Sequence, residues 1–573
     1  MNPSLEASFR EQLDPLRGLW LCVGVVSGWC VFAMPWPFGV ATGTVIALAG
    51  LWAARSAGSR IALLAGAVVQ VGFFQAWEPV PVPADREGRF RVVVERRTAP
   101  GKGVCRILSS VDPTLLDRRV RCEGELGDSL EGKARLRPLR PASNPGGFDA
   151  RSWGASAGLE GFLVWDDDSL LVRKGPVPFG EGLRKWTENV TTHALASRME
   201  ASSASLWTAT LLARNDALPT AALEAFRQSG LFHMLSVSGF HMAVLGGGLV
   251  VLLTLLRVGR RASWLLAASS VLAYAWLLSF PPPVTRSALA FLVLAGAMAS
   301  GRRPNARNAF FLAAALLLVL QPNVAFQMGA QLTFVATAAL LWGTPALTRF
   351  VPLRWRRGRI HDWLVAPVLA SLAATLATAP VLAWHVGTVA WIGIPAGLVS
   401  AAAFALGFLS ALATVLMAWL PAWCSWGFAG AAEGSARLVY EVALRAGEWS
   451  PGSLVPGRPD PWILVGCLLS LVLFFFTVRR RVAGRIWVVL ALVVVAMFAY
   501  AWRPVPPRLR LIALDVGQGS ATLATWPSGR NWLVDAGPGA RTEGGRDAGR
   551  DAILPAMRIL GIPKLDVVAI SHA

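Results

Sequence analysis

Apolar residues fill three long runs near the start of the chain, at 19–34, 38–54 and 61–77. Each run approaches the roughly 20 residues that an α-helix needs to cross a bilayer. We therefore predict three transmembrane helices within residues 1–80. Arg55 and Arg60 lie between the second and third runs, and basic residues mark cytoplasmic loops, so the chain after Trp77 is expected on the outer face of the membrane.

Between residues 84 and 176 the pattern changes to short stretches in which apolar and polar residues alternate, such as 91–95 and 161–165. Glycine, proline and aspartate separate these stretches, and such alternation is typical of β-strands with one buried face. The segment is long enough for a single barrel of about five strands. We predict a small extracytoplasmic β domain at 84–176.

Residues 181–232 have a mixed pattern that predicts amphipathic helices at the membrane surface. The chain then becomes strongly apolar, which predicts a transmembrane domain at 233–502. Its candidate spans lie at 235–256, 264–280, 284–299, 308–320, 329–347, 363–384, 462–477 and 486–502. Arginine clusters between spans, such as 354–359, indicate cytoplasmic loops, and we expect about eleven crossings in total.

The apolar stretch at 391–420 is too long for one crossing and contains Pro395 and Gly407. We predict a hairpin or a re-entrant pair of helices there, because only an even number of crossings lets the following spans reach their arginine clusters.

After Pro504 the chain turns polar again, and residues 508–573 predict an α/β domain. Its expected strands lie at 510–515, 521–525, 531–535 and 565–570, with a helix before the last one. The sequence stops at Ala573, directly after that strand, so we expect the domain to be incomplete.

Composition supports a membrane protein. Apolar residues make up 54% of the 573 residues and charged residues 15%, against about 25% charged residues in soluble domains. Although 54 Lys and Arg against 34 Asp and Glu give a net charge of +20, so apolar a chain cannot remain disordered in water. Among six cysteines, Cys105 and Cys122 fall in the polar β domain. If this domain lies in an oxidising compartment they form a disulfide, and the alternative is two unrelated buried thiols.

The first polar cluster in the transmembrane domain is the segment 233–241, H-M-L-S-V-S-G-F-H. Its hydroxyl and imidazole groups need partners or a wet cavity when they lie in hydrocarbon, so His233, Ser236, Ser238 and His241 either line a pathway or join neighbouring helices. The two histidines are eight residues apart, which argues against a shared metal ion.

The second polar cluster follows three consecutive prolines, where Arg286 begins a predicted span. A guanidinium in the apolar slab either extends to the interface or faces an internal polar cavity. Gln327 and Gln331 place further polar groups at the start of the next span, as expected at a translocation path.

Five segments resemble the ComEC family, the DNA-internalisation proteins of natural transformation. Residues 233–241 resemble its H-L-L-A-[VI]-S-G-L-H signature, and N-P-G-G-F-D at 144–149 is similar to an element of that family. Q-L-T-F at 331–334 resembles Q-L-S-F. L-D-V-G-Q-G at 514–519 and V-D-A-G at 534–537 resemble elements of the family's metallo-β-lactamase-like domain.

The resemblance implies a polytopic α-helical membrane protein with an extracytoplasmic oligonucleotide-binding-type (OB-like) β-barrel and a truncated C-terminal α/β metallo-β-lactamase-like domain. In the OB-like domain, basic residues are expected to contact DNA: Arg89, Arg91, Arg96, Arg97, Lys102, Arg119, Arg121, Arg135 and Arg137. Carboxylates are interleaved with them, so a mixed, solvated surface is the alternative. Trp153 and Phe148 either stack bases or pack in the core.

The family's hydrolase domain places H-x-[HD]-x-D-H ligands after a strand, where two metal ions activate water. His572 stands at the first ligand position, and Asp535 would lie near the metals as a residue behind the ligands. Zinc or manganese is the expected metal of a full-length domain. Metal-dependent nuclease activity is not expected from a chain that ends before this motif is complete, and Ser520 departs from the family's acidic residue.

We interpret the sequence as a bacterial inner-membrane channel that imports single-stranded DNA during natural transformation. His233, Ser236, Ser238, His241, Arg286, Gln327 and Gln331 are the expected path. Expected partners are DNA, the bilayer, an outer DNA receptor and a cytoplasmic DNA motor, although topology alone explains the arginines at 349–359. The alternatives are a membrane-anchored metallo-hydrolase whose helices are scaffold, and a secondary transporter of a small anion.

Overall fold

A computed structural model describes residues 85–463 and 508–571, apart from the short gaps 100–101, 167–169, 176–178, 238, 302–304, 321–323, 325–326, 450–452, 461–462 and 540–546. The predicted spans at 1–80 and after 463 lie outside the described residues. The chain divides into two compact units. The first holds residues up to Pro141 with Asp149–His193 and Val237–Ala330, and the second holds Ala142–Phe148, Ala194–Ser236 and the chain from Gln331.

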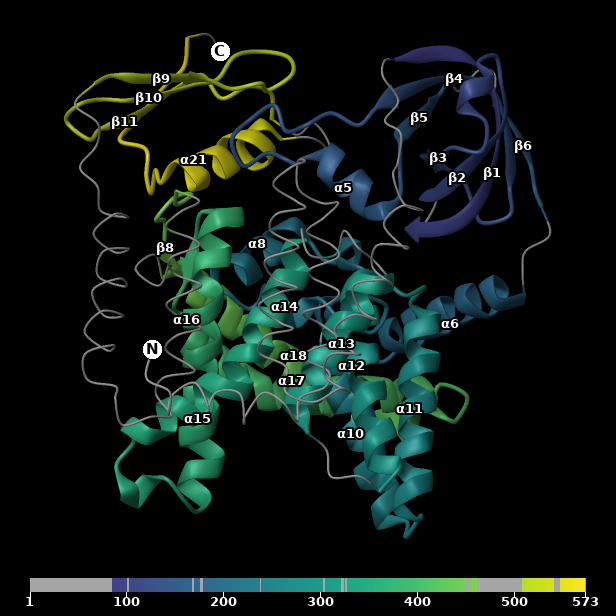
Figure 1. Cartoon of the computed structure of the whole chain (residues 1–573), viewed down its shortest axis with the longest axis vertical. Helices are drawn as coiled ribbons and strands as arrows, with labels where there is room; N and C mark the ends of the chain where they lie inside the picture. Colours follow the sequence, from purple (N-terminus) through teal and green to yellow (C-terminus); the bar gives the residue numbers. More distant parts are fainter. Residues whose placement is uncertain are drawn as a thin grey trace, which may run out of the picture. The chain divides into compact units, whose positions relative to one another are not determined.

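The predicted β domain is a five-stranded barrel with one added strand (Figure 1). Its strands are β1 (Arg86–Ala99), β2 (Lys102–Ser110), β3 (Arg119–Glu123), β4 (Ser129–Pro138), β5 (Gly161–Trp165) and β6 (Leu171–Arg173). The order β1-β2-β3-β5-β4 closes because β1 also pairs with β4, and β3 and β5 run parallel. A closed five-stranded Greek-key barrel is the arrangement of OB-like domains.

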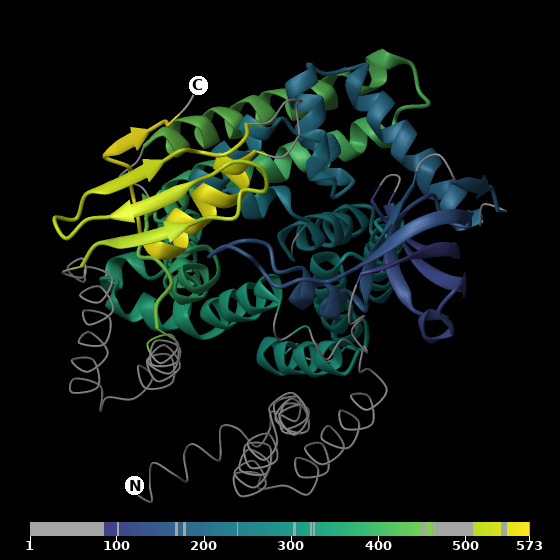
Figure 2. The same cartoon turned by 90° about the horizontal axis from the view of Figure 1, so that it is seen from above.

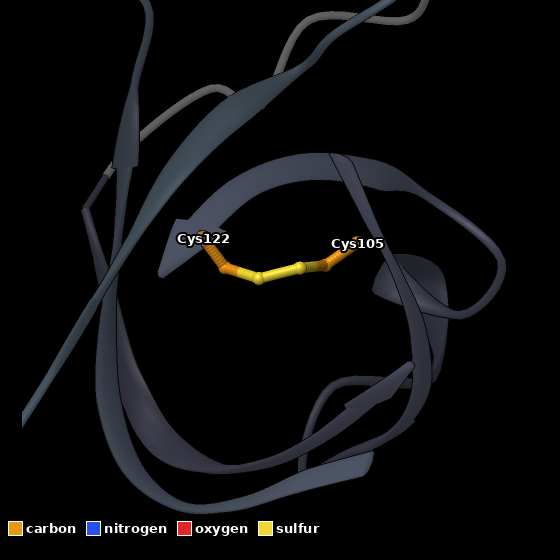
Figure 3. Close-up of a disulfide and its surroundings, with 2 residues drawn as sticks. All are labelled: Cys105 and Cys122. Carbon is orange, nitrogen blue, oxygen red and sulfur yellow. A yellow bond between two sulfur atoms is a disulfide. The ribbon is translucent and has the colours of Figure 1, made fainter. Parts of the chain in front are cut away.

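Alternation along the strands builds the core of the barrel. Phe90, Val92 and Val94 are buried, and so are Cys105 and Cys122, which form a disulfide with a Cα–Cα distance of 6.0 Å. Figure 3 shows this disulfide inside the barrel, between β2 and β3. The side chains between these positions point outward, so the arginines lie on the barrel surface.

The helices of the first unit pack closely at their small residues. They are α5 (Ala150–Ala157), α6 (Phe179–Ala196), α10 (Gly239–Leu255), α11 (Arg260–Leu277), α12 (Pro282–Ala299) and α13 (Ala306–Leu320). A Cβ atom on Gly246 of α10 would lie 2.2 Å from the Phe291 ring of α12, so only glycine permits this approach. The predicted span start at Leu235 is wrong, because the short helix α9 (Phe232–Leu235) ends there and α10 begins at Gly239.

The second unit is built on α7 (Ala201–Leu211) and the long helices α17 (Gly393–Leu416) and α18 (Ala422–Glu448), which pack along each other (Figure 2). For residues 201–211 the prediction of an amphipathic surface helix is wrong, because eight of the eleven residues of α7 are buried. The Trp207 indole Nε1 donates a hydrogen bond of 2.9 Å to the Ala432 carbonyl.

The predicted hairpin or re-entrant pair at 391–420 is wrong, because α17 is one continuous helix of 24 residues. Pro395 lies in its first turn, where a backbone N–H has no partner within the helix and proline is tolerated. Gly407 makes room for a neighbouring ring, since a Cβ there would lie 2.2 Å from the Trp207 side chain. Neither residue breaks the helix.

Further helices of this unit are α8 (Thr220–Gln228), α15 (Thr344–Leu347), α16 (Ala366–Val386) and most of α14 (Met328–Ala338). Wider π-helical turns at Ala339–Gly343 and His361–Val365 each precede a proline, Pro345 and Pro367, by two residues. Proline cannot donate to the carbonyl four residues earlier, and a wider turn accommodates the lost hydrogen bond.

Four helical segments of the described chain are long and apolar enough to cross a membrane: Pro282–Ala299, Met328–Phe350, His361–Val386 and Gly393–Leu416. The first three coincide closely with predicted spans. Gly239–Leu255 and Ala306–Val319 are shorter apolar helices. The chain is therefore a polytopic membrane protein with a β-barrel domain.

The C-terminal part contains a sheet of β9 (Arg510–Ala513), β10 (Thr522–Thr525), β11 (Asn531–Val534) and β12 (Val567–Ala569). The strand order is β12-β11-β10-β9, and only β11 and β12 run parallel. Figure 1 shows α21 (Leu554–Leu560) along one face of this sheet. Leu523, Leu533 and Ala556 are buried between them.

Candidate functional site

Among the residues that the structure describes, Arg286 is the most deeply buried charged group of the membrane helices. It lies in the second turn of α12 and is 5% exposed. Its Nε has no hydrogen-bond partner, and no carboxylate of the described chain forms an ion pair with its guanidinium. Its Nη2 lies 3.0 Å from the position that a Cβ on Gly329 would occupy. Of the two predicted orientations, burial supports the inward one and not extension to the interface.

The start of α10 lies close to the start of α12. A Cβ on Gly239 would be 4.0 Å from the Ser287 hydroxyl, which itself donates to the Pro283 carbonyl at 2.8 Å. His241 is 1% exposed, and its ring meets the Phe240 ring edge to face. The structure therefore brings polar residues of two predicted clusters, on α10 and α12, to adjoining helix starts.

His233 and Ser236 belong to the second unit. The imidazole of His233 is exposed, and its Nδ1 donates to the Gly230 carbonyl at 3.0 Å, because a carbonyl can only accept. Ser236 donates its hydroxyl proton to the His233 carbonyl at 3.2 Å. Ser238, the remaining member of this cluster, lies outside the described residues.

Gln331 has a partner that the sequence did not suggest. Its Oε1 lies 2.8 Å from Nε2 of His385, at the end of α16. Beside His385, the Arg458 guanidinium stacks 4.7 Å from the Trp384 ring centre, and its Nε donates to the Trp384 carbonyl at 2.9 Å. Gln327 lies just before α14, where its backbone N–H bonds to the Val324 carbonyl.

The arginines predicted to contact DNA divide into paired and unpaired groups. Arg91 pairs with Glu131 at 2.7 Å, Arg119 with Glu95 at 3.5 Å, and Arg135 with Glu87. For these three the structure supports the mixed-surface alternative. Arg89, Arg121 and Arg137 form no ion pair within the described residues. The side chains of Arg96, Arg97 and Lys102 lie outside the described part.

One ion pair of the barrel is partly buried. Arg118 and Glu160 are 2.7 Å apart and largely shielded from solvent. Burial raises the pKa of Glu160, although the Arg118 charge acts in the opposite direction. This pair connects the chain before β3 to the chain before β5, the two strands of the barrel that pair in parallel.

Asp535 connects three loops at one end of the C-terminal sheet. Its backbone φ is +57°, a conformation that residues other than glycine rarely adopt. Its carboxylate accepts hydrogen bonds from the hydroxyls of Ser520 at 2.9 Å and Ser571 at 2.8 Å, and from the Ser571 backbone N–H at 2.8 Å. The L-D-V-G-Q-G, V-D-A-G and C-terminal segments therefore meet at this side chain.

The described residues do not form a metal site. No group of three His, Cys, Asp or Glu side chains within the described chain is arranged to hold a metal ion, and His572 lies outside it. The Asp535 carboxylate is already engaged by two serines. Within the described residues, Asp535 is a hydrogen-bonding residue that joins loops.

The N-P-G-G segment contacts the C-terminal domain. Asn144 donates its amide to the Asp515 carbonyl at 2.7 Å, and its Oδ1 accepts the Asp515 backbone N–H at 2.8 Å. Gly146 has a φ of +72°, and a Cβ there would lie 2.6 Å from the Pro555 carbonyl oxygen. Two of the motifs noted in the sequence thus meet in one contact.

Residues 211–481 match a family model described as Competence protein. The chain is 27% identical over 482 residues to "Competence protein ComA" of Neisseria gonorrhoeae, covering 80% of this chain and 63% of that protein. It is 24% identical over 368 residues to "ComE operon protein 3" of Bacillus subtilis, covering 61% and 45% respectively. The chain spans less than two thirds of either relative, and no solved structure matches it.

Proposed function

We propose that this chain, which belongs to the ComEC family of competence proteins, is an inner-membrane channel that imports single-stranded DNA during natural transformation. The observation that carries this proposal is the guanidinium of Arg286, which is buried among apolar helices without an anionic partner in the described chain. A charge in such surroundings costs several kcal/mol unless it meets an anion or water.

A DNA strand supplies the anion that this site lacks. Each nucleotide carries one negative charge, so a conduit for the strand must be hydrated and electropositive. Arg286 lies near the N-terminal end of α12, where the helix dipole adds further positive potential. Ser287 follows Arg286 on α12, and the start of α10, which carries His241, approaches the Ser287 hydroxyl. That His233, Ser236, Gln327 and Gln331 belong to the same path stays a prediction from the sequence.

The barrel domain fits a position on the outer face of the membrane. Disulfides persist in oxidising compartments, and Cys105 and Cys122 are bridged inside the barrel. We propose that the barrel receives DNA there, passed on by an outer receptor, and that a cytoplasmic motor draws the strand inward. The C-terminal sheet with α21 is proposed as the start of a metallo-β-lactamase-like domain on the same face, and a full-length domain would bind zinc or manganese.

An uptake assay tests the channel directly. Duplex DNA labelled on one strand at a time is given to competent cells that carry the wild-type gene or its deletion. We expect the nuclease-protected label recovered from inside the cell to be single-stranded, and to appear only when the gene is present. Protected label in duplex form, or unchanged uptake in the deletion strain, contradicts the proposal.

A further inference from the structure

Three residues form a row on the outer surface of the barrel, across β3, β5 and β4. Phe162 of β5 is in register with Arg121 of β3 on one side and with Arg137 of β4 on the other. Neighbouring strands lie about 4.8 Å apart, so these side chains are adjacent. Their neighbours Leu136 and Leu163 point into the core, which sets the row on the outer face.

Trp153 of α5 joins this row. Its ring is nearly parallel to the Phe162 ring, with an interplanar angle of 4° and centroids 6.1 Å apart. The Arg121 guanidinium lies 5.2 Å from the Trp153 ring centre, within cation–π range. Both rings are only half-buried, and Val164 beside them is 43% exposed. We call Arg121, Arg137, Trp153 and Phe162 the aromatic–arginine patch.

The charge of the patch is not neutralised within the described chain. Neither Arg121 nor Arg137 forms an ion pair there, whereas Arg91 and Arg106 on β1 and β2 contact Glu131 and Glu95. The paired arginines offer little net positive potential to a ligand, because each already has its carboxylate. Positive charge and partly exposed aromatic rings therefore coincide at the patch.

We propose that the aromatic–arginine patch binds single-stranded DNA, with Arg121 and Arg137 contacting phosphates and the rings of Trp153 and Phe162 contacting unpaired bases. This inference rests on the proposed function and assigns the DNA contact to one face of the barrel. Alternating cations and aromatic rings suit a single strand of any sequence, because every base has a π face and every nucleotide a phosphate. Bases in a duplex are stacked on each other and offer no such face.

Trp153 also packs α5 against the barrel, so its removal would disturb the fold as well as the patch. Arg121 and Arg137 give a cleaner test, because they lie on the surface and can be replaced without opening the core. The test variant is Arg121→Gln with Arg137→Gln. The matched control is Arg91→Gln with Arg106→Gln, which removes the same net charge from the same barrel.

The experiment measures binding of fluorescein-labelled oligo-dT to the purified full chain in detergent micelles over a range of salt concentrations. We expect the patch variant to bind about tenfold more weakly, and its slope of log affinity against log salt to fall by about 1.4, at 0.7 per phosphate contact. The control is expected to stay within about twofold of wild type, and Arg121→Lys with Arg137→Lys is expected to retain the slope.

Equal weakening in the patch and control variants overturns the inference, since net charge alone would then explain binding. Wild-type affinity in the patch variant overturns it as well, and so does a wild-type chain that does not bind oligo-dT. The proposed function is judged separately by single-strand uptake in cells. Uptake that persists while the patch proves irrelevant refutes only the inference.

Discussion

Replacement of Arg286 by methionine tests whether the charge of this side chain serves DNA uptake or the stability of the fold. The side chain is 5% exposed and has no ion-pair partner in the described chain, so it contributes no salt bridge that its loss would break. Arginine in an apolar helix costs about 2–3 kcal/mol, and methionine of similar length removes that cost. We therefore expect Arg286→Met to raise the free energy of unfolding by up to about 2 kcal/mol while single-strand uptake falls at least tenfold.

The assay compares thermal unfolding of the purified protein and DNA uptake at equal membrane abundance. Arg261→Met is the matched control, because Arg261 is an exposed arginine at the start of α11 that bonds to the Ala299 carbonyl at 3.2 Å. The control is expected to leave uptake unchanged. Unchanged uptake in Arg286→Met would remove this residue from the path. A large loss of stability would show that Arg286 holds the helices together, which would refute its role as an unpaired charge of the path.

Three further changes test other contacts. Gly329→Ala places a Cβ 3.0 Å from Nη2 of Arg286, so we expect DNA uptake to fall. Because alanine favours a helix more than glycine does, α14 should become up to about 1 kcal/mol more stable. Reduced uptake together with reduced stability would contradict this expectation. Cys105→Ser opens a disulfide that joins residues 17 apart, and the barrel should lose about 3 kcal/mol, measured as protease sensitivity of residues 85–173; equal resistance to wild type counts against it. Asn144→Ala removes two hydrogen bonds to Asp515 and should cost about 1–2 kcal/mol, seen as faster amide exchange at 515–520, whereas the exposed Ser143→Ala should change nothing.

The barrel is the most predictable part of the fold, because its core residues alternate with polar residues along each strand. Val92, Val94, Val120 and Cys122 follow the two-residue period that a half-buried strand imposes. The predicted pairing of Cys105 with Cys122 rested only on their place in a polar segment. The structure adds the strand order and the parallel β3–β5 contact, which depend on side chains far apart in the sequence.

The helix at 393–416 shows where local signals mislead. Proline and glycine are helix breakers in isolation, yet Pro395 occupies a first turn and Gly407 receives the Trp207 ring. The first explanation depends on where the helix starts, and the second depends on a partner 200 residues earlier in the sequence. The amino-acid composition of 391–420 predicts neither the start of the helix nor the contact with Trp207.

The candidate site was predictable in residue type but not in partnership. Arg286 was recognisable as a charge that must face inward or reach the interface, and only packing decides between the two. The contact of Gln331 with His385 was missed, because His385 stands alone at the end of an apolar run. Likewise, the sequence shows carboxylates among the arginines of the barrel but not which arginine each one neutralises.

Cross-linking of a strand in transit tests the central claim most directly. A photoreactive amino acid is placed at His241 or Ser287, at the adjoining starts of α10 and α12, and as a control at Leu266, an exposed position of α11. Labelled DNA is then supplied to competent cells and illuminated during uptake. We predict adducts with one DNA strand at positions 241 and 287 and none at 266. Cells that take up DNA normally without adducts at either inner position would contradict the proposed path.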